Sequence, residues 1–323
     1  MLVMSAPRVI FFESNSNQPS VGGRARTRVR FQDNDAGIEA ARDQNVTSNS
    51  PNPAPTAMSK FERDTQVRRI DEWIWEGEFS PDWSIGQAPN GGYAMALGAR
   101  ALAAALPHPD PMTVTAYYVA RPASGPVRCE VEVLRVGKGT STGMVRLVQG
   151  GETMIQLIGT YTDLDRIQGV NYCAIPIPEM PGFADSVDTP VADNVPLRKQ
   201  LVQRMTPANV KALDGTPDGS SCWLGWTDFA DGGTIDLFGL LLFSDAMPPP
   251  AFALYGPEGW VPTLDLSVQI HARPAPGPLR CKFETSLITE GTLNEDGWLW
   301  DSQGKLVALA RQTAKLRVKP RGI

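Results

Sequence analysis

Two polar residues in the C-terminal half of the chain stand where the local pattern favours apolar ones. Asp245 follows the apolar run 237–243 and falls in the last turn of the helix predicted there, where the macrodipole disfavours an anion by about 0.3–1 kcal/mol. Gln312 shares a predicted strand face with small apolar residues, and burying its amide unpaired would cost roughly 1–3 kcal/mol. The carboxylate could act as a base or simply begin the turn towards Pro248. The amide needs structural hydrogen bonds or a bound water.

Few other residues offer acid–base or metal chemistry. Thr263 begins a predicted strand, where by itself it is an ordinary β-branched residue. The chain has only two histidines, His108 and His271, which excludes a metal site built from several of them. None of the four cysteines belongs to a C-x-x-C pair, which argues against a zinc module. We therefore expect chemistry without a metal.

The segment Gly139–Gly143 fits the G-x-S-x-G pattern of serine hydrolases. Ser141, Asp245 and His271 even follow the chain order of one hydrolase class. A nucleophile elbow, however, needs a strand, a sharp turn and then a helix, whereas Ser141 precedes the strand-like segment Met144–Val148. The context therefore disfavours a nucleophilic serine.

An internal repeat organises the elements around these residues. Residues 118–129 (YVARPASGPVRC) and 270–281 (IHARPAPGPLRC) agree at eight of twelve positions with a constant offset of 152, so chance is a poor explanation. The repeat predicts a duplicated domain of about 130 residues. In it Cys129 and Cys281 are equivalent strand positions and not redox partners.

Each copy shows one apolar helix followed by four strands. The first helix follows Asn90-Gly91-Gly92. In the second strand, apolar residues from Val127 to Val133 alternate with charged ones, so the sheet has one buried face that can wrap the helix. The predicted helices cover 93–106 and 235–246, and the strands cover 113–119, 127–136, 142–148 and 153–161, then 263–270, 279–288, 293–300 and 305–318. This pattern predicts an α+β fold.

Four segments give the sequence a family resemblance. They are Pro89–Tyr93 at the first helix, Phe243–Asp245 at the end of the second, Pro262–Asp265, and Leu306–Gln312 in the last strand. Over about residues 67–318 the sequence resembles the acyl-CoA thioesterase II family. The resemblance implies a double hotdog, in which two tandem repeats each wrap an antiparallel sheet around a long central helix.

The resemblance also implies an active site for hydrolysing a fatty acyl-CoA to free fatty acid and CoA. Asp245, Thr263 and Gln312 correspond by position to the Asp, Thr and Gln that hold and activate the hydrolytic water in that family. For the thioester carbonyl we consider the backbone N–H groups of Gly92 and Tyr93 as substrate-binding donors. The glycines before Tyr93 could equally serve to begin the helix. No metal and no cofactor is required.

Two other functions stay open at this point. A hotdog protein could bind acyl-CoA or fatty acid without hydrolysing it, because fold does not guarantee activity. Tandem hotdogs also serve as enoyl-CoA hydratases, which use an Asp/His pair close together in sequence. Neither His108 nor His271 fits that signature, and we expect His271 to lie on the surface at a strand end.

We expect four regions: a disordered extension over 1–64, an N-terminal hotdog over 65–165, a linker over 166–193 and a C-terminal hotdog over 194–323. The extension is rich in polar residues and prolines, a composition that cannot sustain a packed core. Tryptophans 73, 75, 223, 226, 298 and 300 lie near strand segments, where we expect them to pack in the core or at an interface.

The charge and the apolar content of the sequence limit the kinds of partner that this protein can have. With 30 Lys and Arg against 35 Asp and Glu, the net charge is −5, which disfavours nucleic acid. The longest apolar run has about seven residues against the ~18–20 of a membrane span, and charged residues interrupt the N-terminus before any signal-type run. We expect no membrane association, a cytoplasmic protein and, from the resemblance, a homo-oligomer of the dimer-of-double-hotdogs kind.

Overall fold

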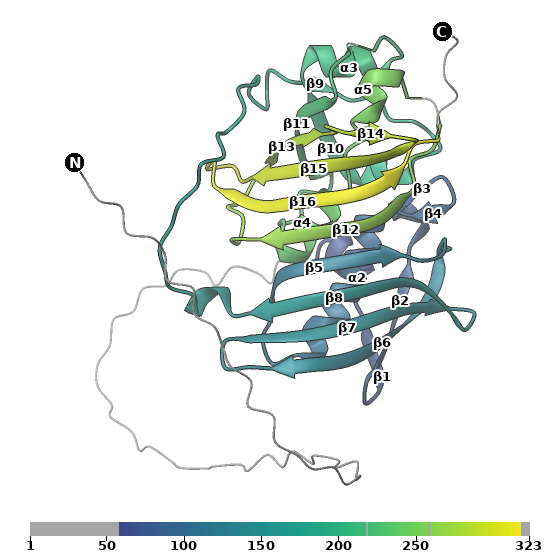
Figure 1. The fold of residues 1–323 in the computed structure, drawn as a ribbon, viewed down its shortest axis with the longest axis vertical. Coiled ribbons are helices and arrows are strands. Elements are labelled where there is room, and N and C mark those ends of the chain that lie inside the picture. The colour runs from purple at the N-terminus through teal and green to yellow at the C-terminus, as the bar shows by residue number, and fades with distance from the viewer. Residues whose placement is uncertain (1–57, 218, 258, 318–323) are drawn as a thin grey trace, which may run out of the picture. The chain divides into compact units, whose positions relative to one another are not determined.

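The computed structural model describes residues 58–217, 219–257 and 259–317 (Figure 1). In the N-terminal half, short elements precede a long apolar helix and four long strands follow it. These elements are α1 (Lys60–Asp64), β1 (Arg68–Asp71), β2 (Ile74–Phe79), η1 (Pro81–Trp83), β3 (Ser84–Ile85), β4 (Ala88–Pro89), α2 (Gly91–Ala105), β5 (Asp110–Tyr118), β6 (Gly125–Val136), β7 (Thr140–Gln149), β8 (Glu152–Thr162) and η2 (Leu164–Arg166).

The C-terminal half repeats this plan with a shorter central helix. Its elements are β9 (Val187–Asp188), η3 (Pro196–Gln200), β10 (Leu201–Met205), α3 (Pro207–Leu213), β11 (Cys222–Phe229), α4 (Leu237–Phe243), α5 (Ala251–Tyr255), β12 (Thr263–Ile270), β13 (Leu279–Glu284), β14 (Ile288–Thr289), β15 (Thr292–Trp300) and β16 (Leu306–Lys315). Each predicted helix and strand has a counterpart among these elements.

One 14-stranded antiparallel sheet joins the two halves. Its order is β1-β2-β6-β7-β8-β5-β12-β16-β15-β13-β11-β10-β9, with β14 paired to β15. Figure 1 shows the two central strands, β5 and β12, side by side in the middle of this sheet, with α2 and α4 behind it. The α+β double-hotdog prediction is confirmed.

The duplication places equivalent residues opposite each other where the halves meet. Thr115 on β5 pairs in register with Ser267 on β12, and their hydroxyl oxygens lie 2.9 Å apart. These two positions differ by 152, the offset of the sequence repeat. A local pseudo-twofold axis therefore passes between them, as it would between two subunits of a symmetric dimer.

Helix α2 begins at a side-chain cap and is buried along most of its length. The Asn90 side-chain oxygen accepts a hydrogen bond from the Tyr93 N–H at 2.9 Å, which satisfies one of the free donors at the helix start. A Cβ on Gly92 would lie 2.5 Å from the Leu241 carbonyl oxygen and 2.8 Å from that of Leu242. Glycine at 92 therefore allows the N-terminus of α2 to touch the backbone of α4, so the two central helices meet.

Some boundaries differ from the prediction. Helix α1 lies inside the expected extension, yet it is ordered because Phe61 is buried and stacks on Phe229 at 5.1 Å between ring centroids. Strands β1, β2, β10 and β11, which flank the two meanders, were not predicted. The rest of the extension, residues 1–57, lies outside the described residues. Within the described part of the chain, no helix is long and apolar enough to span a membrane.

Candidate active site

Asp245 from the C-terminal half reaches the helix of the N-terminal half. It follows α4 directly, after the cap residue Ser244. Its Oδ2 accepts hydrogen bonds from the Gly92 N–H and from the Asn90 side-chain amide, both at 2.9 Å, and its backbone carbonyl accepts a second bond from that amide at 2.8 Å. The carboxylate thus lies at the positive N-terminal end of α2. This contact between the halves, rather than a turn towards Pro248, explains an acid after an apolar helix.

The surroundings of Asp245 set its pKa between two opposing effects. Burial raises the pKa from 3.8 to about 6, while the donors from Gly92, Asn90 and Gly91 lower it. The residue nevertheless retains partial solvent access. A carboxylate that is ionised above about pH 6 can accept a proton near neutral pH, as a general base must.

Thr263 and Gln312 form the second part of the site. The Thr263 hydroxyl donates to the Gln312 side-chain oxygen at 2.7 Å, across the paired strands β12 and β16. Gln312 is buried, as the alternation of β16 predicted, and Thr263 is partly exposed. The bond fixes the orientation of the amide.

Glu295 is a buried acid beside these candidate residues that the sequence analysis did not single out. It lies on β15 directly opposite Gln312 on β16, is only 4% exposed, and its Oε2 has no hydrogen-bond partner among the described residues. Burial first, and then the charge of Asp245, raise its pKa well above the ordinary value, while a hydrogen bond with the Gln312 side chain lowers it. Glu295 therefore links the Asp245 part of the site to the Gln312 part. A signal was available, because alternation from the buried Leu293 places Glu295 on the inner face.

Tyr118 completes the surroundings of Asp245. A Cβ on Gly91 would lie 2.8 Å from both the Asp245 Oδ2 and the Tyr118 hydroxyl, so glycine at 91 leaves these two groups room to approach each other. The buried hydroxyl has no hydrogen-bond partner among the described residues, and burial together with Asp245 raises its pKa. Two buried polar atoms, one from Tyr118 and one from Glu295, are thus left without partners around one carboxylate.

The two backbone donors predicted for the thioester carbonyl are already engaged. The Gly92 N–H serves Asp245, and the Tyr93 N–H serves the Asn90 cap. The Tyr93 side chain points into the core, where its hydroxyl donates to the Asp64 carbonyl oxygen at 2.8 Å. A carbonyl-binding role for Gly92 would require its bond to Asp245 to be replaced, and the roles of Gly92 and Tyr93 stay predictions.

Comparison with known proteins assigns the family. Residues 79–162 match the model of the acyl-CoA thioesterase N-terminal domain, and residues 178–316 match that of the acyl-CoA thioesterase C-terminal domain. The crystal structure of a candidate thioesterase II from Thermobifida fusca is 30% identical, with a TM-score of 0.75 over 82% of this chain and 99% of that chain. The chain belongs to the acyl-CoA thioesterase II family. Membership makes this protein a thioester hydrolase.

More distant matches to this thioesterase II chain include one solved structure, which shares its fold, and one protein matched by sequence. An acyl-CoA thioesterase II, TesB2, from Mycobacterium marinum is 17% identical, with a TM-score of 0.65 over 80% of this chain and 98% of that chain. An uncharacterised protein of Mycobacterium tuberculosis is 27% identical over 267 residues, which cover 75% of this chain and 90% of that protein.

The other candidate residues of this thioesterase lie apart from Asp245. The His108 Nδ1 is 2.6 Å from the Ser141 hydroxyl, but Ser141 is buried within β7 and has no helix after it, so it lacks the elbow of a nucleophile. His271 is exposed, as predicted. Among the described residues, no group of three His, Cys, Asp or Glu side chains could hold a metal.

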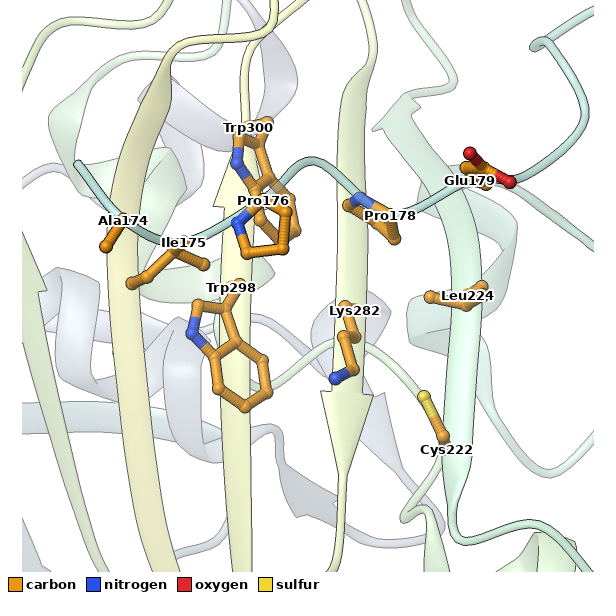
Figure 2. A pocket seen from close by; sticks show the side chains of 10 residues that line it. All are labelled: Ala174, Ile175, Pro176, Pro178, Glu179, Cys222, Leu224, Lys282, Trp298 and Trp300. Carbon is orange, nitrogen blue, oxygen red and sulfur yellow. The ribbon is translucent and has the colours of Figure 1, made fainter.

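A hollow on the outside of the second hotdog is separate from the site. Figure 2 shows residues 174–179 crossing over strands of the C-terminal half, with the indoles of Trp298 and Trp300 beneath. The hollow measures about 480 Å³, and its lining includes neither Asp245 nor Gln312. These two tryptophans pack under residues 174–179, in keeping with their predicted packing role.

Proposed function

We propose that this thioesterase hydrolyses the thioester of a fatty acyl-CoA, with a water held by Asp245, Thr263 and Gln312. The observation that carries the proposal is the Asp245 carboxylate. It comes from one hotdog, is fixed by donors from the other, and has a pKa of about 6. At neutral pH such a group is ionised and can still accept a proton.

In the proposed reaction the water oxygen bonds to the thioester carbon while one of its protons passes to Asp245. The carbonyl π electrons move onto the oxygen, which becomes an oxyanion. When the C=O bond re-forms, the C–S bond breaks and the CoA sulfur takes the proton back from Asp245. The products are the free acid and CoA thiol, and the base is restored.

Thr263 and Gln312 would orient the water in this scheme. Their mutual hydrogen bond fixes the amide plane, and holding a reactant in attack geometry removes part of the entropic barrier. We expect each of them to contribute through kcat rather than through substrate affinity.

The test is release of free CoA thiol from short-, medium- and long-chain acyl-CoAs by the purified protein. We expect hydrolysis of at least one chain length. Hydration of an enoyl-CoA without thiol release would instead support the hydratase function, and acyl-CoA binding without turnover would support a binding protein. Either of these results would overturn the proposal.

A further inference from the structure

Glu295 is a buried carboxyl for which the three-residue scheme has no role. Its neighbours explain why it differs from Asp245. Asp245 receives hydrogen bonds from a backbone N–H and a side-chain amide, whereas Glu295 has the Gln312 side chain and an Oε2 without any partner. A buried carboxylate with an unpartnered oxygen is costly, so the neutral acid is the favoured form of Glu295.

The charges around Glu295 act in the same direction. Asp245, which follows α4, and Asp296, the next residue on β15, both disfavour a negative charge on Glu295. Asp296 is itself paired with Arg311, with nitrogen–oxygen distances of 2.5 and 2.9 Å, so the Arg311 cation is committed to Asp296. Asp245 and Glu295 thus have environments that favour different protonation states, and such pairs of carboxyls typically serve as base and acid.

The site needs a donor that these contacts leave available. The attacked carbonyl oxygen acquires negative charge, and a donor aimed at it in a dry site is worth a large factor in rate. The backbone N–H groups of Gly92 and Tyr93 are both engaged. A protonated Glu295 would present an O–H at the unpartnered Oε2, on the inner face of the sheet and beside Gln312.

We propose that Glu295 is a further catalytic residue, a neutral acid that donates a hydrogen bond from Oε2 to the thioester oxygen. It does so while the water that Asp245 activates adds to the thioester carbon. The role rests on the proposed hydrolytic function. Glu295 keeps its proton throughout, so the atoms and electrons balance as in the scheme above. The hydrogen bond from Glu295 strengthens as the thioester carbonyl oxygen becomes an anion, and it weakens again when the C–S bond breaks.

The test compares two uncharged replacements of Glu295, one that keeps a hydrogen-bond donor and one that has none. Glu295→Gln keeps a neutral side chain of similar shape with N–H donors, and Glu295→Met keeps the approximate volume without a donor. In acyl-CoA hydrolysis by the full chain we expect Glu295→Met to lose about 10²–10³-fold in kcat, as for removal of an oxyanion donor. We expect KM to stay within about threefold and Glu295→Gln to keep kcat within about tenfold.

Unfolding temperature provides the control. Glu295→Met removes a buried oxygen that lacks a partner but also the hydrogen bond with the Gln312 side chain, so we expect it to fold and to unfold at a slightly lower temperature than the wild type. If Glu295→Met keeps kcat within about threefold, or if Glu295→Gln loses as much as 10²-fold, the neutral-donor role is wrong. Should Glu295→Met fail to fold, Glu295→Leu, which likewise lacks a donor, takes its place with the same expected loss of kcat. A wild type that hydrolyses no acyl-CoA would overturn the proposed function itself.

Discussion

Replacing Gly91 by alanine should damage catalysis without unfolding the protein. The added Cβ would lie 2.8 Å from the Asp245 Oδ2 and from the Tyr118 hydroxyl, and 3.0 Å from the Tyr118 ring carbon that bears it. Gly91 has no positive φ, so the backbone itself accepts alanine. The perturbation therefore acts on the carboxylate and on the phenol.

The structure gives the size of this effect. To reach an ordinary contact of 3.4 Å, the Asp245 oxygen must move by about 0.6 Å, which strains its 2.9 Å bond from the Gly92 N–H. A charge-assisted bond of this kind contributes roughly 1.5–3 kcal/mol, and a misplacement of about 1 Å at a reacting group can cost about 10²-fold in rate. We expect kcat/KM to fall about 10–100-fold. A helix-propensity gain of up to about 1 kcal/mol offsets only part of an overpacking cost of about 1–3 kcal/mol, so the net loss of stability is at most about 3 kcal/mol.

Gly98→Ala is the matched control for Gly91→Ala. It makes the same change in the same helix, but its Cβ would meet only the ends of leucine side chains, at 3.1 Å and beyond. We expect Gly98→Ala to keep wild-type activity. The assay is CoA thiol release, with thermal unfolding of both variants. Wild-type activity in Gly91→Ala, or an equal loss in Gly98→Ala, would refute the argument from the Asp245 environment.

Two more predictions concern ionisation. Because Asp245 acts as a base with a pKa of about 6, kcat/KM should fall as pH drops through about 6, and Asn90→Ala, which removes a donor to the carboxylate, should move this fall to higher pH. An Asn90→Ala variant whose kcat/KM falls at the same pH as that of the wild type would contradict this prediction. Burial raises the pKa of Cys129 to about 12 and that of Cys281 higher, so a disulfide thiol reagent should modify exposed Cys173 in the native protein and these two only after unfolding. Fast native labelling of Cys129 would show this prediction wrong.

Local patterns predicted the parts of the fold that local residues determine. Alternation placed Gln312 on the buried face of its strand, and the 152-residue offset gave the duplication that brings Thr115 opposite Ser267. The sequence could not predict that one sheet would run through both hotdogs. That outcome depends on pairing between β5 and β12, which no local pattern encodes.

The partners of the site residues were harder to predict for the same reason. Asp245 and Asn90 are 155 positions apart, and only the crossing of α2 and α4 brings them together. Glu295 is flanked by Asn294 and Asp296, so its segment looks like a polar surface strand. It is the register of β15 with β16 that sets Glu295 beside Gln312. Composition thus hid a buried acid that strand alternation could have revealed.

The central claim is that Asp245 activates the hydrolytic water, and the most direct test is kcat for Asp245→Asn against wild type on the best acyl-CoA substrate. Folding raises the pKa of Asp245 from 3.8 to about 6. Protonation of Asp245 therefore stabilises the folded protein fully below about pH 3.8, and this stabilisation is lost as the pH rises through about 6. The asparagine variant should therefore be no less stable than wild type at pH 7.5.

Under those conditions we expect kcat of Asp245→Asn to fall by about 10²–10⁴-fold, the usual contribution of a general base. Its dissociation constant for a non-hydrolysable acyl-CoA analogue should stay within about threefold of wild type. A folded variant that binds the analogue and keeps more than a third of wild-type kcat would contradict the account.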